Sequence, residues 1–446
     1  VLVNAPFASA IARFGARPAQ REVDRRLVYV DPRPPPATPS DPGETRPVGF
    51  FAAILGSLSA IPREQPIRDD LEALDAQSRK ARELLEIVEA LRPDVEQAVD
   101  RLFGHTLFLD RPSPARLAAW RRKAQQAAAE RAGYTFHAYA QAKFSGVVLR
   151  LARVLVSAQP MLAGGDEGAL AARLRGELSG QGLGRLTAPG GGASPAAIAF
   201  FRAHDLAFRV RRLRLIARRL SRDWPGEAGL DPAALDQARD AIYGALSLYF
   251  EREDPASLGA GFADIAAHAM HDPGAVLAAL AQRAALSELD SAAEAMLAAA
   301  LDQMARPLRR RVLMAYLGFP FYDIATLPLL RNEGLTEFDP VKVDRISPDD
   351  AVSIRAGGAA ATLRGIELFN FGGFFSRAYR ENDYLWGRFH GAERMIDLIA
   401  STAAGALGAQ AVRSAKRAAF LAICAEEEAR GLCAERRIAR LRAEIE

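Results

Sequence analysis

The chain has 446 residues, of which 50% are hydrophobic and 25% are charged, as in a globular protein with about two or three domains. Its net charge of +4 comes almost wholly from arginine. A field this small for the length would act only through local clusters, and we expect no nucleic-acid partner.

Membrane insertion and disulfide chemistry are not expected either. Apolar runs fall short of the roughly 18 residues that span a bilayer, and the run Val48–Ile61 is interpreted as a buried helix. Cys424 and Cys433 would lie about 13 Å apart along a helix, too far for a disulfide. We therefore expect a reducing, cytoplasmic location.

Because the sequence opens on Val1 without Met or a signal peptide, we expect it to begin within a longer protein.

The first 33 residues predict the end of an α/β domain. Asn4 can cap a helix over residues 5–14, and residues 26–30 (RLVYV) have the pattern of a buried strand. One strand needs sheet neighbours for its backbone groups, yet the next strand pattern comes about 300 residues later. The interpretation is therefore a remnant whose earlier strands are missing.

Residues 34–47 are predicted to be a proline-rich linker, followed by a helical region over 48–446. A helix is expected over Glu167–Leu178 between glycine-rich stretches. Four further helices should begin at a capping Ser or Asp followed by Pro, whose missing N–H costs nothing there. These starts are Ser113-Pro114, Ser194-Pro195, Asp231-Pro232 and Asp272-Pro273.

A small β insertion interrupts the helical region near its end. Residues 341–346 and 361–368 alternate and carry β-branched side chains, so each is predicted to be a short strand. Helices should resume near Phe374, with one beginning near Tyr384. The expected fold class is mainly α: a multi-helical region with this insertion, preceded by the remnant of a truncated α/β domain.

Residues for nucleophilic or metal chemistry are sparse. The sequence has no G-x-S-x-G motif; its nearest match, Gly192 to Ala196, has Pro195 where an oxyanion-hole amide is needed. Ser194 is therefore interpreted as a helix cap. Asp264, His268, His271 and Asp272 share helical spacing, but a surface or interhelical role is favoured over a metal site. We expect no catalytic residue, metal or cofactor in this chain.

Residues 200–222 form a basic amphipathic helix with two interpretations. Arginines cover much of its surface beside one apolar stripe, Leu206, Val210, Leu213, Ala217 and Leu220. Such a helix can lie on an anionic membrane surface, here through Arg209, Arg211, Arg212 and Arg218. It can equally be a core helix with an ion-paired outer face, which is the favoured interpretation.

The stretch 369–399 is the most varied in chemistry, with paired glycines, aromatic residues and many charges. Its arginines could bind carboxylates or phosphates. The favoured interpretation is a structural node of buried aromatics and ion-paired arginines. The candidate cluster, structural or functional, is Arg380, Asp383, Trp386 and Arg388.

Two sets of segments resemble patatin-related proteins. The runs VLVNAPF at 1–7 and RRLVYVDP at 25–32 resemble the sequence after the catalytic Asp-Gly-Gly of patatin-like acyl hydrolases, with Asn4 and Pro6 matching the family's Asn and Pro. The segments 316–323, 345–349, 371–374 and 380–388 resemble the long helical C-terminal extension of these bacterial proteins. The role of that extension is unassigned.

The resemblance implies a lipid acyl hydrolase with a Ser-Asp dyad, acting on a lipid or acyl ester. Both dyad residues would lie before Val1, so only the flanking Asn4 and Pro6 carry over, and the chain alone is expected to be inactive. His390 stands where many relatives have Asp. The helical region is expected to shape or cover the lipid cleft; the alternative is an interaction or membrane-docking module.

Overall fold

The chain divides into two compact units, which are described separately. Unit 1 combines Val1–Ile11, Asp24–Ser78 and Asp339–Glu446, and unit 2 combines Ala12–Val23 and Arg79–Phe338. The computed structural model describes residues 7–16, 20–32, 61–104, 112–330, 340–367, 372–403 and 407–446. The expected linker at 34–47, the flanking residues Asn4 and Pro6, and the apolar run up to residue 60 lie outside the described residues.

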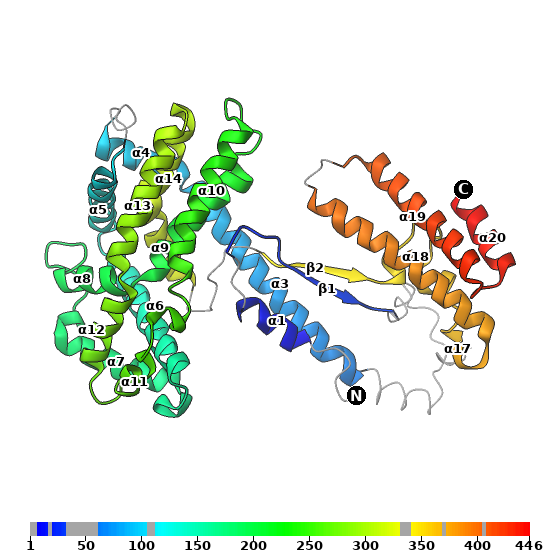
Figure 1. Cartoon of the computed structure of the whole chain (residues 1–446), viewed down its shortest axis with the longest axis horizontal. Helices are drawn as coiled ribbons and strands as arrows, with labels where there is room; N and C mark the ends of the chain where they lie inside the picture. Colours follow the sequence, from blue (N-terminus) through cyan, green and yellow to red (C-terminus); the bar gives the residue numbers. More distant parts are fainter. Residues whose placement is uncertain are drawn as a thin grey trace, which may run out of the picture. The chain divides into compact units, whose positions relative to one another are not determined.

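Unit 2 is a bundle of helices, and the prediction of a mainly α fold is confirmed. Helices α9, α13 and α14 run side by side in it (Figure 1). Its helices are α4 (Arg92–Phe103), α5 (Pro114–Arg131), α6 (Thr135–Ala158), α7 (Glu167–Leu178), α8 (Pro195–His204), α9 (Leu206–Arg218), α10 (Pro232–Phe250), α11 (Phe262–Ala267), α12 (Pro273–Ala284), α13 (Leu286–Gln303) and α14 (Arg306–Thr326). Two further helices, α1 (Phe7–Ala16) and α3 (Ile61–Ala90), have residues in both units.

The four predicted Ser-Pro and Asp-Pro helix starts are confirmed. In each case the capping side chain accepts a hydrogen bond from a backbone N–H in the first turn. The cap supplies an acceptor that the helix itself lacks, and Pro occupies a position whose N–H would have no partner. The helix predicted over Glu167–Leu178 is also found with those bounds, as α7, capped by Asp166.

Helix α14 is the central helix of unit 2. The stretch Arg306–Leu329 has the length and apolar composition of a membrane-spanning helix, but 67% of its most apolar window is buried inside the protein, as in a core helix. Gly318 faces α4, where an added Cβ would lie 2.6 Å from Cγ1 of Val95. The missing side chain thus lets the two helices approach closely.

Unit 1 holds a two-stranded parallel sheet. The strand β1 (Arg26–Val30) has the predicted bounds, and β2 (Lys342–Ile346) begins one residue after the predicted start. Arg26 is paired with Lys342 and Val30 with Ile346. An ion pair between Arg26 and Asp344 at 2.9 Å crosses the two strands. The neighbour that β1 requires is therefore supplied by a segment more than 300 residues away.

The start of β2 is held by α3. The hydroxyl of Ser78 donates to the carbonyl of Val341 at 3.0 Å and accepts from the N–H of Val341 at 3.1 Å. Ser78 is 3% exposed, and both bonds are partly buried. One side chain thereby satisfies both backbone groups of the residue that precedes the strand.

One face of β1 is apolar and uncovered in the described part of the chain. Leu27 is buried and Tyr29 packs against Phe7 of α1 with ring centroids 5.2 Å apart. On the opposite face Val28 is 45% and Val30 is 68% exposed. Parallel sheets are normally covered on both faces, so this sheet is unusual as a free-standing element.

The remainder of unit 1 is helical, with a second small core. Short helices α15 (Gly358–Thr362) and α17 (Gly372–Phe375) precede α18 (Arg377–Thr402), α19 (Ala409–Arg430) and α20 (Glu435–Ile445). In Figure 1, α18 and α19 lie side by side. Their core includes Leu385, Trp386, Phe389 and Phe420.

Two predictions for this region are wrong. Residues 361–368 were expected to be a strand, but α15 extends to Thr362 and the chain then turns, with residue 368 outside the described part. A run of alanines and Thr followed by glycine favours this short helix over an extended strand. The helix expected to begin near Tyr384 begins seven residues earlier, where Ser376 accepts a hydrogen bond from the N–H of Tyr379.

Candidate functional site

A pocket of about 440 Å³ opens among the helices of unit 2. A volume of this size suits a small organic ligand. Its walls come from α5, α6, α8, α9, α13 and α14 and from the turn at 191–193. Six cationic side chains and three carboxylates line it: Arg121, Arg122, Lys143, Arg202, Arg209, Arg212, Glu130, Asp205 and Asp290.

The pair Arg209–Asp290 forms one wall of the pocket. Nε and Nη2 of Arg209 donate to the two carboxylate oxygens of Asp290 at 2.7 and 2.8 Å. Tyr249 donates its hydroxyl to the same carboxylate at 2.8 Å. Burial alone would raise the pKa of Asp290, but the hydrogen bond and charge of Arg209 outweigh it and lower that pKa. Asp290 is therefore ionised, and both of its carboxylate oxygens already accept hydrogen bonds, from Arg209 and Tyr249.

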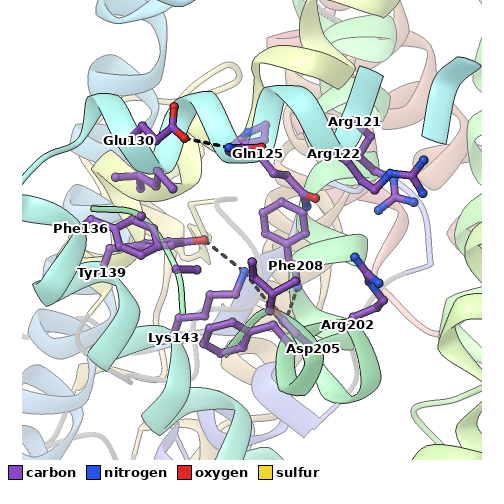
Figure 2. A pocket seen from close by; sticks show the side chains of 18 of the residues that line it. Arg121, Arg122, Gln125, Glu130, Phe136, Tyr139, Lys143, Arg202, Asp205 and Phe208 are labelled. Carbon is purple, nitrogen blue, oxygen red and sulfur yellow. Dashed lines mark hydrogen bonds and ion pairs between the residues drawn. The ribbon is translucent and has the colours of Figure 1, made fainter. Parts of the chain in front are cut away.

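A second network, of hydrogen bonds and ion pairs, begins at Lys143. Its ammonium group lies 2.8 Å from Oδ2 of Asp205 and donates to the hydroxyl of Tyr139 at 3.1 Å. Tyr139 in turn donates to Asp323 at 2.7 Å, and Arg211 pairs with the other oxygen of Asp323 at 2.8 Å. Figure 2 shows the first part of this network, Tyr139, Lys143 and Asp205, between α6 and α9.

Burial and charge together determine which groups of this network carry a proton. Burial would raise the pKa of Asp205, but Lys143 and Arg211 outweigh it and lower the pKa. Burial raises the pKa of Tyr139 well above its usual value, and the charge of Asp323 raises it further. At neutral pH the carboxylate of Asp205 is thus ionised. The phenol of Tyr139 keeps its proton and donates it in the hydrogen bond to Asp323.

Arg212 differs from the other buried cations of the pocket. It is 3% exposed, and within the described residues its guanidinium has no ion pair or hydrogen bond; Nε is fully buried. The guanidinium lies 4.3 Å from the ring centroid of Tyr316 and 5.8 Å from that of Phe208. Such stacking offsets part of the desolvation cost but leaves the N–H groups without acceptors.

Arg122 and Arg202 line the pocket from the exposed side. Both are exposed, and in the described part of the chain neither side chain has an ion-pair partner. Figure 2 shows them with Arg121 on one side of the pocket, while Phe136, Tyr139 and Lys143 lie on the other. The pocket therefore has a cationic side and a mixed aromatic side.

The predicted cluster on the stretch 369–399 lies in unit 1, and its four side chains have separate partners. Arg380 donates to the carbonyl of Gly373 at 2.8 Å. Asp383 accepts from two backbone N–H groups, of residues 364 and 365, each at 2.7 Å. Trp386 is 1% exposed, and Arg388 pairs with the carboxylates of residues 426 and 427.

These contacts agree with the structural interpretation of that cluster. Asp383 closes a turn, Trp386 fills the core under the guanidinium of Arg355, which lies 4.7 Å from its ring, and Arg388 joins α18 to α19. His390 is buried against the ring of Trp386 at 5.3 Å. Residues 368–371, including the first residues of the stretch, lie outside the described part.

The basic helix around α9 is a core helix. All five residues of its predicted apolar stripe are buried. Arg209 and Arg212 are buried as well, and Arg211 is paired with Asp323. Arg218, the last of the four named arginines, is half-buried and acts electrostatically on Asp223. This burial favours the core interpretation over a membrane-surface role for the four residues.

The minor candidates have structural contacts. Ser194 caps α8 by accepting from the N–H of Ala197 at 3.2 Å. Asp272 caps α12 by accepting from the N–H of Ala275 at 3.0 Å. Asp264 lies in the short helix α11, and His268 and His271 follow it in the turn that leads to Asp272.

The pocket itself was missed at the sequence level. Tyr139, Lys143, Asp205 and Asp290 were not singled out. Tyr139 and Lys143 share α6, but their carboxylate partners, Asp323 and Asp205, lie on other elements and are distant in sequence. One signal was available: Asp323 interrupts the long apolar run of α14. A charged residue in such a run has to be paired when the helix is buried.

Comparisons with known proteins identify part of the chain. A family model described as "Protein of unknown function (DUF3376)" matches residues 250–423. The match includes Asp290 of the pocket, β2 and α18, whereas most of the pocket-lining residues precede it. No curated protein and no solved structure matches the chain at a significant level. The chain therefore contains a DUF3376 domain of unknown function.

Proposed function

We propose that this chain acts together with a patatin-like lipid acyl-hydrolase domain, and that its C-terminal region is built into the sheet of that domain. One observation carries the proposal. The strand that resembles the last strand of a patatin-like domain, β1, pairs in parallel with β2, which lies in the DUF3376 match. A region that is only tethered through a linker would have no need to share a sheet with that strand.

Two further contacts support a built-in arrangement. Helix α18 packs against β2, and Nε of Arg394 on α18 donates to the carbonyl of Arg345 in β2 at 3.2 Å. Arg345 also pairs with Asp31, directly after β1, at 3.6 Å. The stretch that resembles the patatin-related extension is thereby connected through β2 to the strand that resembles the hydrolase.

The exposed face of β1 supports a missing layer. Val28 and Val30 present an apolar face to solvent in the described residues, and burial of such a face normally comes from helices or further strands of an α/β domain. The proposed role of the helical region is to shape access to the lipid cleft of that domain. The lipid substrate would be bound and cleaved by the hydrolase domain, with its own Ser-Asp dyad.

The experiment is to express this chain together with the reading frame that precedes Val1 and to assay p-nitrophenyl acyl ester hydrolysis. The expected reading frame has G-x-S-x-G after a strand and Asp-Gly-Gly directly before Val1. Hydrolysis should require the Ser of G-x-S-x-G and the Asp of Asp-Gly-Gly in that reading frame. The 446-residue chain alone should be inactive. Activity of the chain alone that is lost on replacing one of its own residues would contradict the proposal, as would a start codon there without a hydrolase domain.

A pair of proline variants distinguishes the built-in arrangement from a tethered docking module. The N–H of Lys342 donates to the carbonyl of Arg25 at 2.9 Å, and alternate N–H groups of a strand face the same neighbour. The N–H of Asp344 therefore faces β1, and that of Val343 faces away. In the longer protein, Asp344→Pro should lower hydrolase activity strongly, whereas Val343→Pro should have little effect. Equal activity of the two variants would favour the docking module.

A further inference from the structure

We propose that the pocket of unit 2 binds a small amphipathic anion, a carboxylate or phosphate group attached to an apolar chain, and that Arg212 holds the anionic group. This site belongs to unit 2, whereas the sheet on which the proposed hydrolase role rests belongs to unit 1, so the site stands or falls independently of that role. Three features support this assignment: the unpaired charge of Arg212, the bonding of the neighbouring carboxylates, and the apolar wall of the pocket.

The first feature is the unpaired charge of Arg212. A guanidinium on a residue that is 3% exposed has lost most of its hydration, which is unfavourable unless an anion or other acceptors replace the water. The Nε–H of Arg212 is buried without an acceptor, and the aromatic rings of Tyr316 and Phe208 are weak substitutes. Arg209 and Arg211 on the same helix instead have carboxylate partners, Asp290 and Asp323.

The second feature is the bonding of the carboxylates near Arg212. Asp290 acts on it electrostatically, but the oxygens of Asp290 accept from Arg209 and Tyr249. The carboxylate of Glu294 accepts from Arg121 at 2.6 Å. These anions are thus neutralised by other partners. A planar guanidinium with free N–H groups facing a pocket is suited to a fork of hydrogen bonds to a carboxylate or phosphate.

The third feature is the chemistry of the remaining wall. The apolar side chains Phe136, Phe208 and Ile324 line the same pocket, and Phe136 and Phe208 are buried. A bare inorganic anion would leave this surface in contact with water. An anion that carries an apolar chain covers it and gains the free energy of apolar burial. The exposed Arg122 and Arg202 at the rim would draw anions toward the opening.

The test uses the full 446-residue chain and four probes: octanoate, octyl phosphate, inorganic phosphate and octanol. Isothermal titration calorimetry should give one site per chain for octanoate or octyl phosphate, and which of the two binds tighter distinguishes a carboxylate from a phosphate ligand. Octanol and inorganic phosphate should bind at least about tenfold more weakly, because each lacks one half of the recognised chemistry. Phosphate binding as tight as octyl phosphate would overturn the amphipathic assignment.

Two variants on the same helix provide the matched comparison. Arg212→Met should weaken binding by about 10- to 100-fold. Arg214→Met should leave binding unchanged, because Arg214 stacks on Phe250 and does not line the pocket. Unchanged binding in Arg212→Met, or no binding of any probe to the natural chain, would overturn the proposal.

A stability measurement separates a ligand-binding role from a structural one. Because Arg212 is buried without a partner, Arg212→Met should keep or raise the melting temperature of the chain without ligand. A structural arginine would show the opposite, a lower melting temperature. The probe that binds should raise the melting temperature of the natural chain and not that of Arg212→Met. A large loss of stability in Arg212→Met would contradict the assignment.

Discussion

Arg209 on α9 and Asp290 on α13 share two parallel hydrogen bonds although 81 residues separate them. Both residues are 6% exposed. The geometry is the fork that arginine forms with carboxylates, and it joins two helices of the bundle at the wall of the pocket. Removal of either partner would leave the other as a buried charge.

The first prediction follows from this pair. Arg209→Met and Asp290→Asn should each lower the free energy of unfolding by about 3–5 kcal/mol, the cost of an uncompensated buried charge. The double variant should cost clearly less than the sum, because it leaves neither charge. Denaturant unfolding of the natural chain and the three variants provides this double-mutant cycle. Additive effects would show that the two side chains are not coupled.

The second prediction concerns the hydroxyl of Tyr139. Tyr139→Phe should lower the free energy of unfolding by about 1–3 kcal/mol, because Asp323 loses a buried donor and Lys143 loses an acceptor. Tyr134→Phe is the control, since Tyr134 is 88% exposed and should change stability by less than about 0.5 kcal/mol. Equal effects of the two substitutions would show that the hydrogen bond at position 139 contributes nothing.

The third prediction tests the bonds that hold β2. Ser78→Ala removes the one hydroxyl that serves both the N–H and the carbonyl of Val341. The expected loss is about 1–3 kcal/mol, because two buried backbone groups lose their partner. Ser401→Ala is the control in the same unit: its hydroxyl is exposed and bonds only to a carbonyl of its own helix.

Hydrogen exchange provides a second measurement for Ser78→Ala. Exchange of the backbone amides of β1 and β2 should become faster, because the start of β2 is less firmly held. Unchanged protection of both strands would show that Ser78 does not position β2, whatever the change in global stability.

The fourth prediction is a loss of stability in mild acid. Burial lowers the pKa of His204 to about 4, and burial, partly opposed by Glu393 and Asp349, lowers that of His390 to about 4. In the unfolded chain a histidine has a pKa of about 6.5. Between these values the unfolded state binds more protons, so stability is lost as the pH falls from about 6.5 toward 4.

At pH 5 each of the two histidines should reduce the free energy of unfolding by about 2 kcal/mol relative to pH 7.5. The measurement is denaturant unfolding across this range. His204→Asn should make the pH dependence shallower, because it removes one of the two buried imidazoles. A natural chain as stable at pH 5 as at pH 7.5 would contradict the prediction.

Local patterns determined many of the elements. The Ser-Pro and Asp-Pro pairs predicted four helix starts, because a cap and the missing N–H of proline act within one turn. The pattern RLVYV predicted β1 with its observed bounds. The stripe from Leu206 to Leu220 predicted the buried side of α9. The strand predicted over residues 361–368 was wrong, because a short apolar and polar alternation does not by itself distinguish a strand from a short helix, and the alanines that precede Thr362 favour the helix.

Pairing between distant segments was decided only by the tertiary structure. The sequence predicted that β1 needs a neighbour but not that the neighbour is β2, because a period of two fixes a strand's faces and not its partner. The surface of α9 was rich in arginine, yet whether Arg209 meets water, a membrane or Asp290 depends on which helix packs there. The unpaired state of Arg212 emerges only from the packed bundle, in which Asp290 and Glu294 bond to other partners, because electrostatic balance is a property of the bundle and not of any one helix.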